Sequence, residues 1–309
     1  MKDIIIVGGG AAGLAAAAYA LDKQLDMLLI VEDLGGKAGT QQQLNNHSGE
    51  ETLLGADLIQ LLARRVTRHV GAVLHDRVTN ISKYNDVFWV ETQHHGYQEA
   101  SVVLVATGAS PLLLNVPGAQ KLVNYGVGYS ITTHAHMLES KTVAVIGTTD
   151  RALLGAVELA TIGAYVYLIA PDASNLTSRL GHRLRHLPQV TIFERYEVTQ
   201  IAGETNVEHL VIKRDNEETI LHVDAVFADL GLLPNSGLVR QLIPVDQDGF
   251  IWVDDLNMTA LPGLFAAGDV TTAFAENILV AAGDGTRAAI NAYAYLLSQK
   301  PQPAAEPVD

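Results

Sequence analysis

The clearest chemical pattern lies in six residues near the start of the chain, Gly8-Gly9-Gly10-Ala11-Ala12-Gly13, which match G-x-G-x-x-G. An apolar stretch typical of a buried strand precedes them, and an alanine-rich stretch typical of a helix follows. In such a loop Gly8 makes the turn, Gly10 lets a diphosphate approach the backbone, and Gly13 allows close helix packing. The helix N-terminus then faces the negative charge. Glu32 ends the next expected strand, where a carboxylate can accept a hydrogen bond from a ribose hydroxyl. The pattern predicts a dinucleotide site.

Two later segments indicate which dinucleotide binds. Ala106-Thr107-Gly108 closes the apolar strand 102–105, and Gly268-Asp269 follows an apolar stretch near the C-terminus. In this order the motifs resemble those of the low-molecular-weight thioredoxin reductases, flavoproteins with two dinucleotide-binding domains. The resemblance covers residues 5–297. It implies FAD at the first site, with Ala106, Thr107 and Gly108 beside the nucleotide. Gly268 and Asp269 would then meet the ribityl–diphosphate region of the cofactor.

The resemblance also implies flavin neighbours in three further segments. Gly36-Lys37 matches the family's G-G-Q, with lysine in place of glutamine. Lys37 would favour a reduced, anionic flavin if it points at the ring, and otherwise it is a solvated lysine. Asn46 is retained from the family's N-[WY]-P-G, while His47 is either a flavin contact or an exposed loop residue. Glu276-Asn277-Ile278 replaces R-Q-A, and the peptide amides near Asn277 and Ile278 are expected to face the flavin pyrimidine.

The redox disulfide of the family is missing. Its C-A-T-C-D motif corresponds to residues 130–134, where Ser130 and Thr133 replace the cysteines, and the 309 residues contain no cysteine. Hydroxyl groups have neither the thiolate nor the redox couple that disulfide exchange requires. His134 replaces the aspartate and is a candidate catalytic proton donor to reduced flavin. The alternative is that His134 and His136 are polar residues of a remodelled loop. They do not predict a metal site, because no third ligand is evident.

A second glycine loop begins at Gly147, but it departs from the family's G-x-G-x-x-A. Thr149 stands where a side chain obstructs the approach of a diphosphate. The family's H-R-R cluster, which holds the NADPH 2′-phosphate, is replaced by Ala170-Pro171-Asp172. Asp172 would repel a phosphate. NADPH binding in the family's manner is therefore not expected. NADH is less strongly excluded, because Asp172 could meet a ribose hydroxyl.

The order of the elements predicts an α/β fold with two Rossmann-like (three-layer ββα) dinucleotide-binding domains, the second inserted into the first. The first β-α-β unit comprises strand 3–7, helix 11–22 and strand 27–31. The second comprises strand 142–146, a helix ending near 162 and strand 165–169. A β-rich stretch, 72–105, lies between them, and a late helix is expected at 283–297. We expect a discontinuous FAD-binding domain, 1–112 and 239–309, and a degenerate NAD(P)-binding-like domain, 113–238.

Composition excludes several partners. The net charge of -14 argues against nucleic acid, because phosphates would be repelled. Apolar runs do not reach the roughly 20 residues that span a bilayer, so a membrane partner is not expected. Residues 1–7 lead directly into a strand and a glycine turn, so a signal peptide is not expected. We expect a cytoplasmic protein. The resemblance implies a homodimer built largely through the FAD domain.

Three functions fit these observations. The first is an FAD-dependent oxidoreductase that exchanges electrons with an external partner, such as ferredoxin or flavodoxin, or through a second FAD. The second is a non-catalytic flavin-binding protein that serves in sensing, storage or scaffolding. The third is an NADH-dependent reductase of ferredoxin or flavodoxin, against which Thr149 and Asp172 argue.

Overall fold

The computed structural model describes residues 1–39, 54–272 and 275–299. Among these residues the chain forms two compact units. Unit 1 comprises 1–39, 54–110, 233–272 and 275–299, and unit 2 comprises 111–232. Unit 2 is therefore inserted in the sequence of unit 1. The assignment of unit 1 to FAD and of unit 2 to a degenerate nucleotide domain stays a prediction.

Unit 1 contains a seven-stranded sheet within its described residues. Its strands run in the order β3-β2-β1-β6-β5-β4, and β17 pairs with β6. The pairs β1–β2, β1–β6, β2–β3 and β6–β17 are parallel, whereas β4–β5 and β5–β6 are antiparallel. The strands are β1 (Lys2–Val7), β2 (Met27–Val31), β3 (Val73–His75), β4 (Val78–Tyr84), β5 (Val87–Thr92), β6 (Gly96–Val105) and β17 (Leu264–Ala266).

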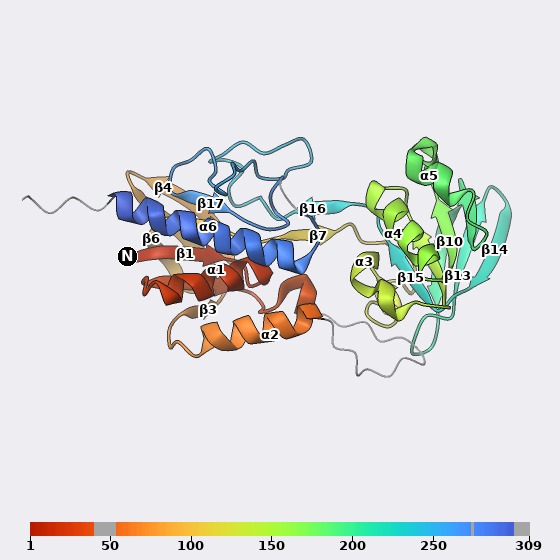
Figure 1. Ribbon diagram of the computed structural model, residues 1–309, viewed down its shortest axis with the longest axis horizontal. Coiled ribbons are helices and arrows are strands. Elements are labelled where there is room, and N and C mark those ends of the chain that lie inside the picture. Colours follow the sequence, from red (N-terminus) through yellow and green to blue (C-terminus); the bar gives the residue numbers. More distant parts are fainter. Residues whose placement is uncertain (40–53, 273–274, 300–309) are drawn as a thin grey trace, which may run out of the picture. The chain divides into compact units, whose positions relative to one another are not determined.

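Three helices accompany this sheet, α1 (Ala11–Asp22), α2 (Leu54–Thr67) and α6 (Ile278–Gln299), and a short 3-10 helix spans Gly36–Gly39. Figure 1 shows α1 and α6 packed along each other. Small side chains allow this close packing, because most of α1 is alanine. A Cβ added at Gly285 of α6 would lie 1.9 Å from the carbonyl oxygen of Ala12. The two backbones therefore meet beside the first turn of α1.

A buried carboxylate anchors the turn between β5 and β6. The Asp76 side chain is fully buried, and its two oxygens accept from Nδ1 of His94 at 2.9 Å and of His95 at 2.6 Å. The backbone N–H groups of Arg77, His94 and His95 also donate to it. Burial alone would raise the pKa of Asp76, but these hydrogen bonds hold it well below its usual range.

Unit 2 contains a five-stranded parallel sheet, in the order β11-β10-β9-β15-β8, and a three-stranded antiparallel sheet, β12-β13-β14. The strands of the first are β8 (Val127–Gly128), β9 (Thr142–Ile146), β10 (Tyr165–Ala170), β11 (Val190–Glu194) and β15 (Ala225–Ala228). Those of the second are β12 (Glu197–Ala202), β13 (His209–Arg214) and β14 (Glu217–His222). The helices are α3 (Ile131–His134), α4 (Asp150–Thr161) and α5 (Arg179–Leu184), with 3-10 helices at Ala135–Met137 and Ser174–Thr177. The crossovers between the units contain β7 (Ala109–Pro111) and β16 (Leu232–Pro234), which pair with each other.

The predicted α/β class with two Rossmann-like units is confirmed. Both β-α-β openings lie within a residue or two of the bounds that were expected, and α4 ends at Thr161, one residue before the expected end. The late helix, α6, begins at Ile278 rather than at the expected Gly283, because Asn277 caps it. The Asn277 Oδ1 atom accepts from the backbone N–H groups of Leu279 and Val280. In the part of the chain that the structure describes, no helix has the length and hydropathy that crossing a membrane requires.

Candidate functional site

The first glycine loop lies between β1 and α1, and three of its glycines are required by packing. An added Cβ at Gly8, whose φ is +114°, would lie 2.3 Å from the Ala106 carbonyl oxygen. At Gly9 it would lie 2.5 Å from the Asp33 carbonyl oxygen, and at Gly13 1.9 Å from that of Gly8. These distances are shorter than any real Cβ contact, so larger residues would displace the backbone.

Gly10 is different. A Cβ added there would have no atom of the described structure within 4 Å, and its φ of -76° and ψ of -173° are open to any residue. Packing and backbone conformation therefore do not explain a glycine at this position. Gly10 is the N-cap of α1, has no side chain to cap the helix, and leaves the first N–H groups of α1 for a ligand. This is the geometry that a dinucleotide diphosphate uses, so the residues present fit FAD.

The other predicted contacts of the nucleotide surround this loop. Glu32 follows β2 at its carboxyl end and is exposed, with Oε1 3.8 Å from Nε of Arg77. Ala106 packs against Gly8. Thr107 and Asn235 form two hydrogen bonds. The Thr107 hydroxyl donates to the Asn235 carbonyl oxygen at 2.8 Å, and the Asn235 side-chain amide donates to the Thr107 carbonyl oxygen at 2.9 Å. Gly108 has a φ of +67°. Asn235 thus fixes the 106–108 segment, although no sequence pattern pointed to it.

The predicted flavin neighbours Lys37 and Asp269 meet directly. The Lys37 Nζ atom lies 2.6 Å from Oδ2 of Asp269 and 3.0 Å from Oε1 of Glu276. The Lys37 side chain is 40% exposed, whereas Asp269 and Glu276 are 12% and 15% exposed. Lys37 is therefore an exposed lysine whose amine contacts two carboxylates, and its role beside the flavin stays a prediction. The two departures from the family's motifs, lysine for glutamine and glutamate for arginine, form an ion pair with each other.

A second ionic group lies on α6 close to Asp269. Nη2 of Arg287 is 2.7 Å from Oδ1 of Asp284, and its Nε donates to Oδ1 of the buried Asn257 at 2.6 Å. The Oδ2 atom of Asp284 is buried without a hydrogen-bond partner in the described residues. Burial raises the pKa of Asp284, and the Asp269 charge raises it further against the opposing effect of Arg287. Sequence reasoning missed this group, although the i,i+3 spacing of Asp284 and Arg287 could have suggested the pair.

Four further residues, each expected or considered as a flavin contact, differ in what the structure describes of them. The Oδ1 atom of Asn277 caps α6, its backbone N–H donates to the Ala275 carbonyl oxygen, and its carbonyl oxygen accepts from the Ala281 N–H. Ile278 is the first residue of α6 and is partly buried against the core of unit 1. Asn46 and His47 lie outside the described residues. Binding roles of all these residues remain predictions.

The second glycine loop lies between β9 and α4. It has a glycine that packing requires, Gly147, but it has Thr149 at the position that corresponds to Gly10. An added Cβ at Gly147 would lie 2.2 Å from the Asp229 carbonyl oxygen, as at Gly8. Thr149 stands two residues later, as Gly10 does after Gly8. Its Oγ1 caps α4 by accepting from the Ala152 N–H at 3.0 Å and donates to Oδ1 of Asp229 at 3.1 Å. The side chain therefore occupies the loop.

Asp229 is buried and ionically paired in this arrangement. Its Oδ2 lies 3.2 Å from Nη2 of Arg151. Burial raises the pKa of Asp229, while Arg151 and the Thr149 hydroxyl oppose this effect. The predicted steric obstacle at Thr149 is thus part of a hydrogen-bonded network rather than a loose side chain.

The segment after β10 is also satisfied internally. The carboxylate of Asp172 accepts from the N–H and hydroxyl of Ser174, which lowers its pKa and keeps it negatively charged. Thr148 donates to the Asp172 carbonyl oxygen, and the Asn175 amide donates to the Thr148 carbonyl and to Asp150. These bonds connect the loops after β9 and β10.

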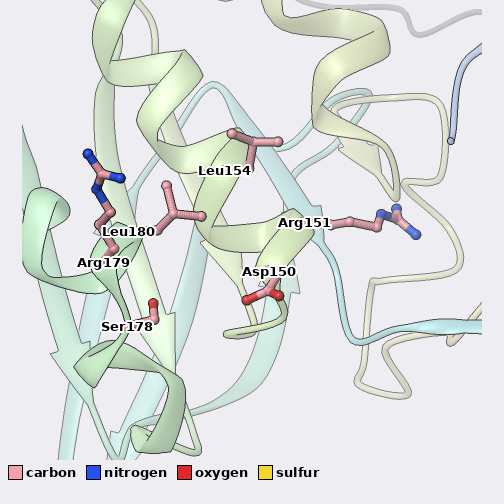
Figure 2. Close-up of a pocket in the computed structure, with 6 residues that line it drawn as sticks. All are labelled: Asp150, Arg151, Leu154, Ser178, Arg179 and Leu180. Carbon is pink, nitrogen blue, oxygen red and sulfur yellow. The ribbon is translucent and has the colours of Figure 1, made fainter.

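A surface hollow of about 370 Å³ lies beside this loop pair. Figure 2 shows its lining, with Leu154 and Leu180 near each other and Arg151 extending away from the rest. The lining residues are Asp150, Arg151, Leu154, Ser178, Arg179 and Leu180.

Comparison with known proteins places this geometry in a family. Residues 2–293 match the family model described as pyridine nucleotide-disulphide oxidoreductase. The chain belongs to this family. It is 33% identical over 300 residues to the F subunit of alkyl hydroperoxide reductase from Staphylococcus aureus (strain NCTC 8325), covering 96% of this chain and 59% of that protein. The chain thus spans little more than half the length of this relative.

Solved structures agree. The thioredoxin reductase from Streptococcus pyogenes MGAS5005 has a TM-score of 0.85 and 28% identity, covering 96% of this chain and 99% of that one. The Lactococcus lactis thioredoxin reductase has a TM-score of 0.66 and 26% identity, covering 96% and 100%. The predicted resemblance to thioredoxin reductases is confirmed, and the family supports FAD binding.

The chain has a histidine, His134, beside the positions where the family's cysteines were expected. Nδ1 of His134 lies 3.0 Å from the Ser130 carbonyl oxygen, and its ring packs on Phe227 with centroids 6.0 Å apart. Nε2 is buried without a hydrogen-bond partner in the described residues. Burial lowers the pKa of His134, and the nearby His136 lowers it further, against the effect of the Ser130 bond. A catalytic role for His134 stays a prediction. Across the described residues, no group of three or more possible ligands forms a metal site.

Proposed function

We propose that the chain is an FAD-dependent oxidoreductase that does not use NADPH or an internal disulfide and that exchanges electrons with an external partner. When bound at the first glycine loop, FAD would supply the redox chemistry, accepting or donating one or two electrons. The chain's own residues hold the dinucleotide: the open backbone at Gly10 and the N-terminus of α1 meet the diphosphate, and Glu32 and Asp269 accept from ribose and ribityl hydroxyls.

The contrast between the two glycine loops carries this proposal. Both loops keep the glycine that packing requires, Gly8 and Gly147. The position where a diphosphate approaches the backbone is open at Gly10 and closed at Thr149. Asp172, which remains charged, adds repulsion where NADPH would need a cation. These features support a functional first site and a closed second one.

The missing cysteines point the same way. With serine at 130 and threonine at 133, these 309 residues cannot form the thiolate or disulfide of a conventional thioredoxin reductase. In our proposal electrons therefore leave or reach the flavin through a redox group outside these residues. The similarity to the F subunit of alkyl hydroperoxide reductase supports a redox protein as the partner, and ferredoxin and flavodoxin are our candidates.

The test is anaerobic reduction of the purified holoprotein. Flavin is first released from a denatured sample, identified and counted per chain. The remainder is titrated with NADPH, NADH and dithionite, and flavin bleaching is followed by absorbance. We expect reduction by dithionite and by reduced ferredoxin or flavodoxin, with bleaching by NADPH at least a hundredfold slower. Prompt bleaching by NADPH would refute the proposal and restore a pyridine-nucleotide reductase with an external acceptor.

The same experiment separates two other functions. Two flavins per chain would indicate a second FAD, for which the hollow lined by Leu154, Leu180 and Arg179 offers an apolar surface with a nearby cation. A single flavin that no redox protein reduces would favour a non-catalytic flavin-binding protein.

The homodimer that the resemblance implies remains a prediction. Light scattering of the purified protein would check it.

A further inference from the structure

We propose that Lys37 is the counter-charge for the FAD diphosphate, kept in position by Glu276. The inference rests on the FAD binding of the proposed function but not on the identity of the electron donor. It concerns a residue at which this chain departs from the G-G-Q motif and which the structure places in an ion pair.

The first step is the position of the amine. The segment before Lys37 lies against the glycine loop: the Gly35 N–H donates to the Gly9 carbonyl oxygen at 2.8 Å, and a Cβ at Gly36 would lie 3.0 Å from Cα of Gly10. Lys37 is therefore the first side chain after a backbone contact with Gly10, the open position of the loop. Its flexible stem can carry a cation towards the first turn of α1.

The second step is the position of its partner. A Cβ at Gly268 would lie 3.0 Å from Cβ of Ala12, so Asp269 also begins beside the first turn of α1. The Lys37 Nζ atom is 2.6 Å from Asp269 Oδ2. Lys37 and Asp269 thus converge from two segments on the end of α1, where uncapped N–H groups favour an anion.

The third step concerns charge. Lys37 faces two carboxylates, Asp269 and Glu276, both mostly buried. Without the lysine, an incoming diphosphate would meet two negative groups and no cation from this segment. Asp284 lies close enough to Asp269 for the Asp269 charge to raise its pKa. Its ion-pair partner is Arg287. Arg287 neutralises Asp284, and among the described residues Lys37 is a cation that lies beside the glycine loop, in position to neutralise the phosphates.

Glu276 has a distinct task in this arrangement. Asp269 is expected to turn to the ribityl chain when FAD binds, so Lys37 would lose one of its two carboxylate contacts. The 3.0 Å contact with Glu276 retains the amine at the site. Glu276 is a positioning residue, and its negative charge also opposes the diphosphate. Glutamine at position 276 keeps a side-chain oxygen that can accept from the Lys37 amine, but it removes the negative charge that opposes the diphosphate. Glu276→Gln should therefore bind FAD as tightly as the wild type or more tightly.

The experiment measures ligand affinity of the apoprotein rather than activity. FAD and riboflavin are titrated by fluorescence quenching into the wild type, Lys37→Gln, Glu276→Gln and the matched control Lys2→Gln. Lys2 forms a 2.6 Å ion pair with Asp26 on the surface of the same unit, so its variant makes the same charge change away from the loop. Riboflavin carries the ring and ribityl chain without phosphate, and it isolates the diphosphate contribution.

We expect Lys37→Gln to raise the Kd for FAD about tenfold or more, the usual effect of losing a charge-assisted contact. The Kd for riboflavin should stay within about twofold, and the FAD effect should shrink at high ionic strength. Lys2→Gln should match the wild type. An FAD affinity unchanged in Lys37→Gln, or an equal loss for riboflavin, overturns the inference.

Glu276→Gln keeps the inference testable if Lys37→Gln does not fold. Its Kd for FAD should equal or fall below that of the wild type, and a tenfold rise would overturn the inference. If the wild type binds FAD and NADPH bleaches the flavin promptly, the proposed function is refuted but this inference is not. If the wild type binds FAD and Lys37→Gln has the same Kd for FAD, this inference is refuted but the proposed function is not.

Discussion

A single methyl group at Gly10 should separate folding from cofactor binding. In Gly10→Ala the new Cβ meets no atom within 4 Å, and the φ of -76° suits alanine. Alanine is a poorer N-cap than glycine, but it also restricts the unfolded chain, so the free energy of unfolding of the apoprotein should change by no more than about 1 kcal/mol. The methyl group would occupy the space through which the diphosphate reaches the backbone.

The expected change in the Kd for FAD follows from the hydrogen bonds that the methyl group would weaken. Moving the diphosphate outward affects one or two charge-assisted hydrogen bonds to the N-terminus of α1, each worth about 1.5 to 3 kcal/mol. The Kd for FAD should therefore rise by at least about tenfold, and by a hundredfold or more if both bonds break. Urea denaturation of the apoprotein and fluorescence titration with FAD measure the two quantities.

Gly13→Ala is the matched control, because it adds the same methyl group three residues later. There the Cβ would lie 1.9 Å from the Gly8 carbonyl oxygen, so the apoprotein itself should be strongly destabilised. The reasoning is wrong if Gly10→Ala binds FAD within threefold of the wild type. It is equally wrong if Gly10→Ala is as unstable as Gly13→Ala.

Three other changes test separate parts of the molecule. Thr149→Ala removes the cap of α4, so it should lower the free energy of unfolding of unit 2 by about 1 to 2 kcal/mol in urea denaturation. Thr149→Ser keeps the hydroxyl and should change this free energy little. Equal stability of the wild type and both variants would contradict the capping role. His134 has a lowered pKa, so its neutral form is favoured by folding and wild-type stability should fall as pH drops below 6.5 and through the folded pKa. His134→Leu should lose less stability than the wild type between about pH 7 and pH 5, and parallel pH profiles would rule out this contribution. Asp76 has a pKa held below its usual range, so it stabilises the fold at neutral pH and this contribution is lost on acidification. Asp76→Asn should melt at a lower temperature at pH 7, with the difference narrowing in acid; a constant difference would show that charge is not the cause.

The fold was predictable because its signals are local. A strand, a glycine turn and an alanine-rich helix stand within the first 22 residues, and the same order recurs from Thr142. The start of α6 was harder to predict. Asn277 caps the helix from a segment that the resemblance assigned to flavin contact, so the first turn was not recognised as helix.

The ionic groups of the candidate site were not predictable in the same way. Lys37 and Glu276 are 239 positions apart, and each looks like an isolated departure from a motif until the fold brings them together. Asp284 resembles an exposed helix carboxylate in sequence. It is buried because Gly285 lets α6 approach the backbone of Ala12, which depends on long-range packing. The departure from the glycine motif at Thr149 could be seen in the sequence, but its hydrogen bonds to α4 and Asp229 could not.

The network at Thr149 makes the divergence of the second loop difficult to reverse. A change from threonine back to glycine would reopen the backbone, but it would also remove the cap of α4 and one partner of the buried Asp229. If this loop binds no NADPH, as we propose, gaining affinity for it would need a cation near Asp172 as well, and each single change would lose stability before it gained a ligand. The Thr149 hydroxyl therefore couples the opening of this loop to the stability of the fold.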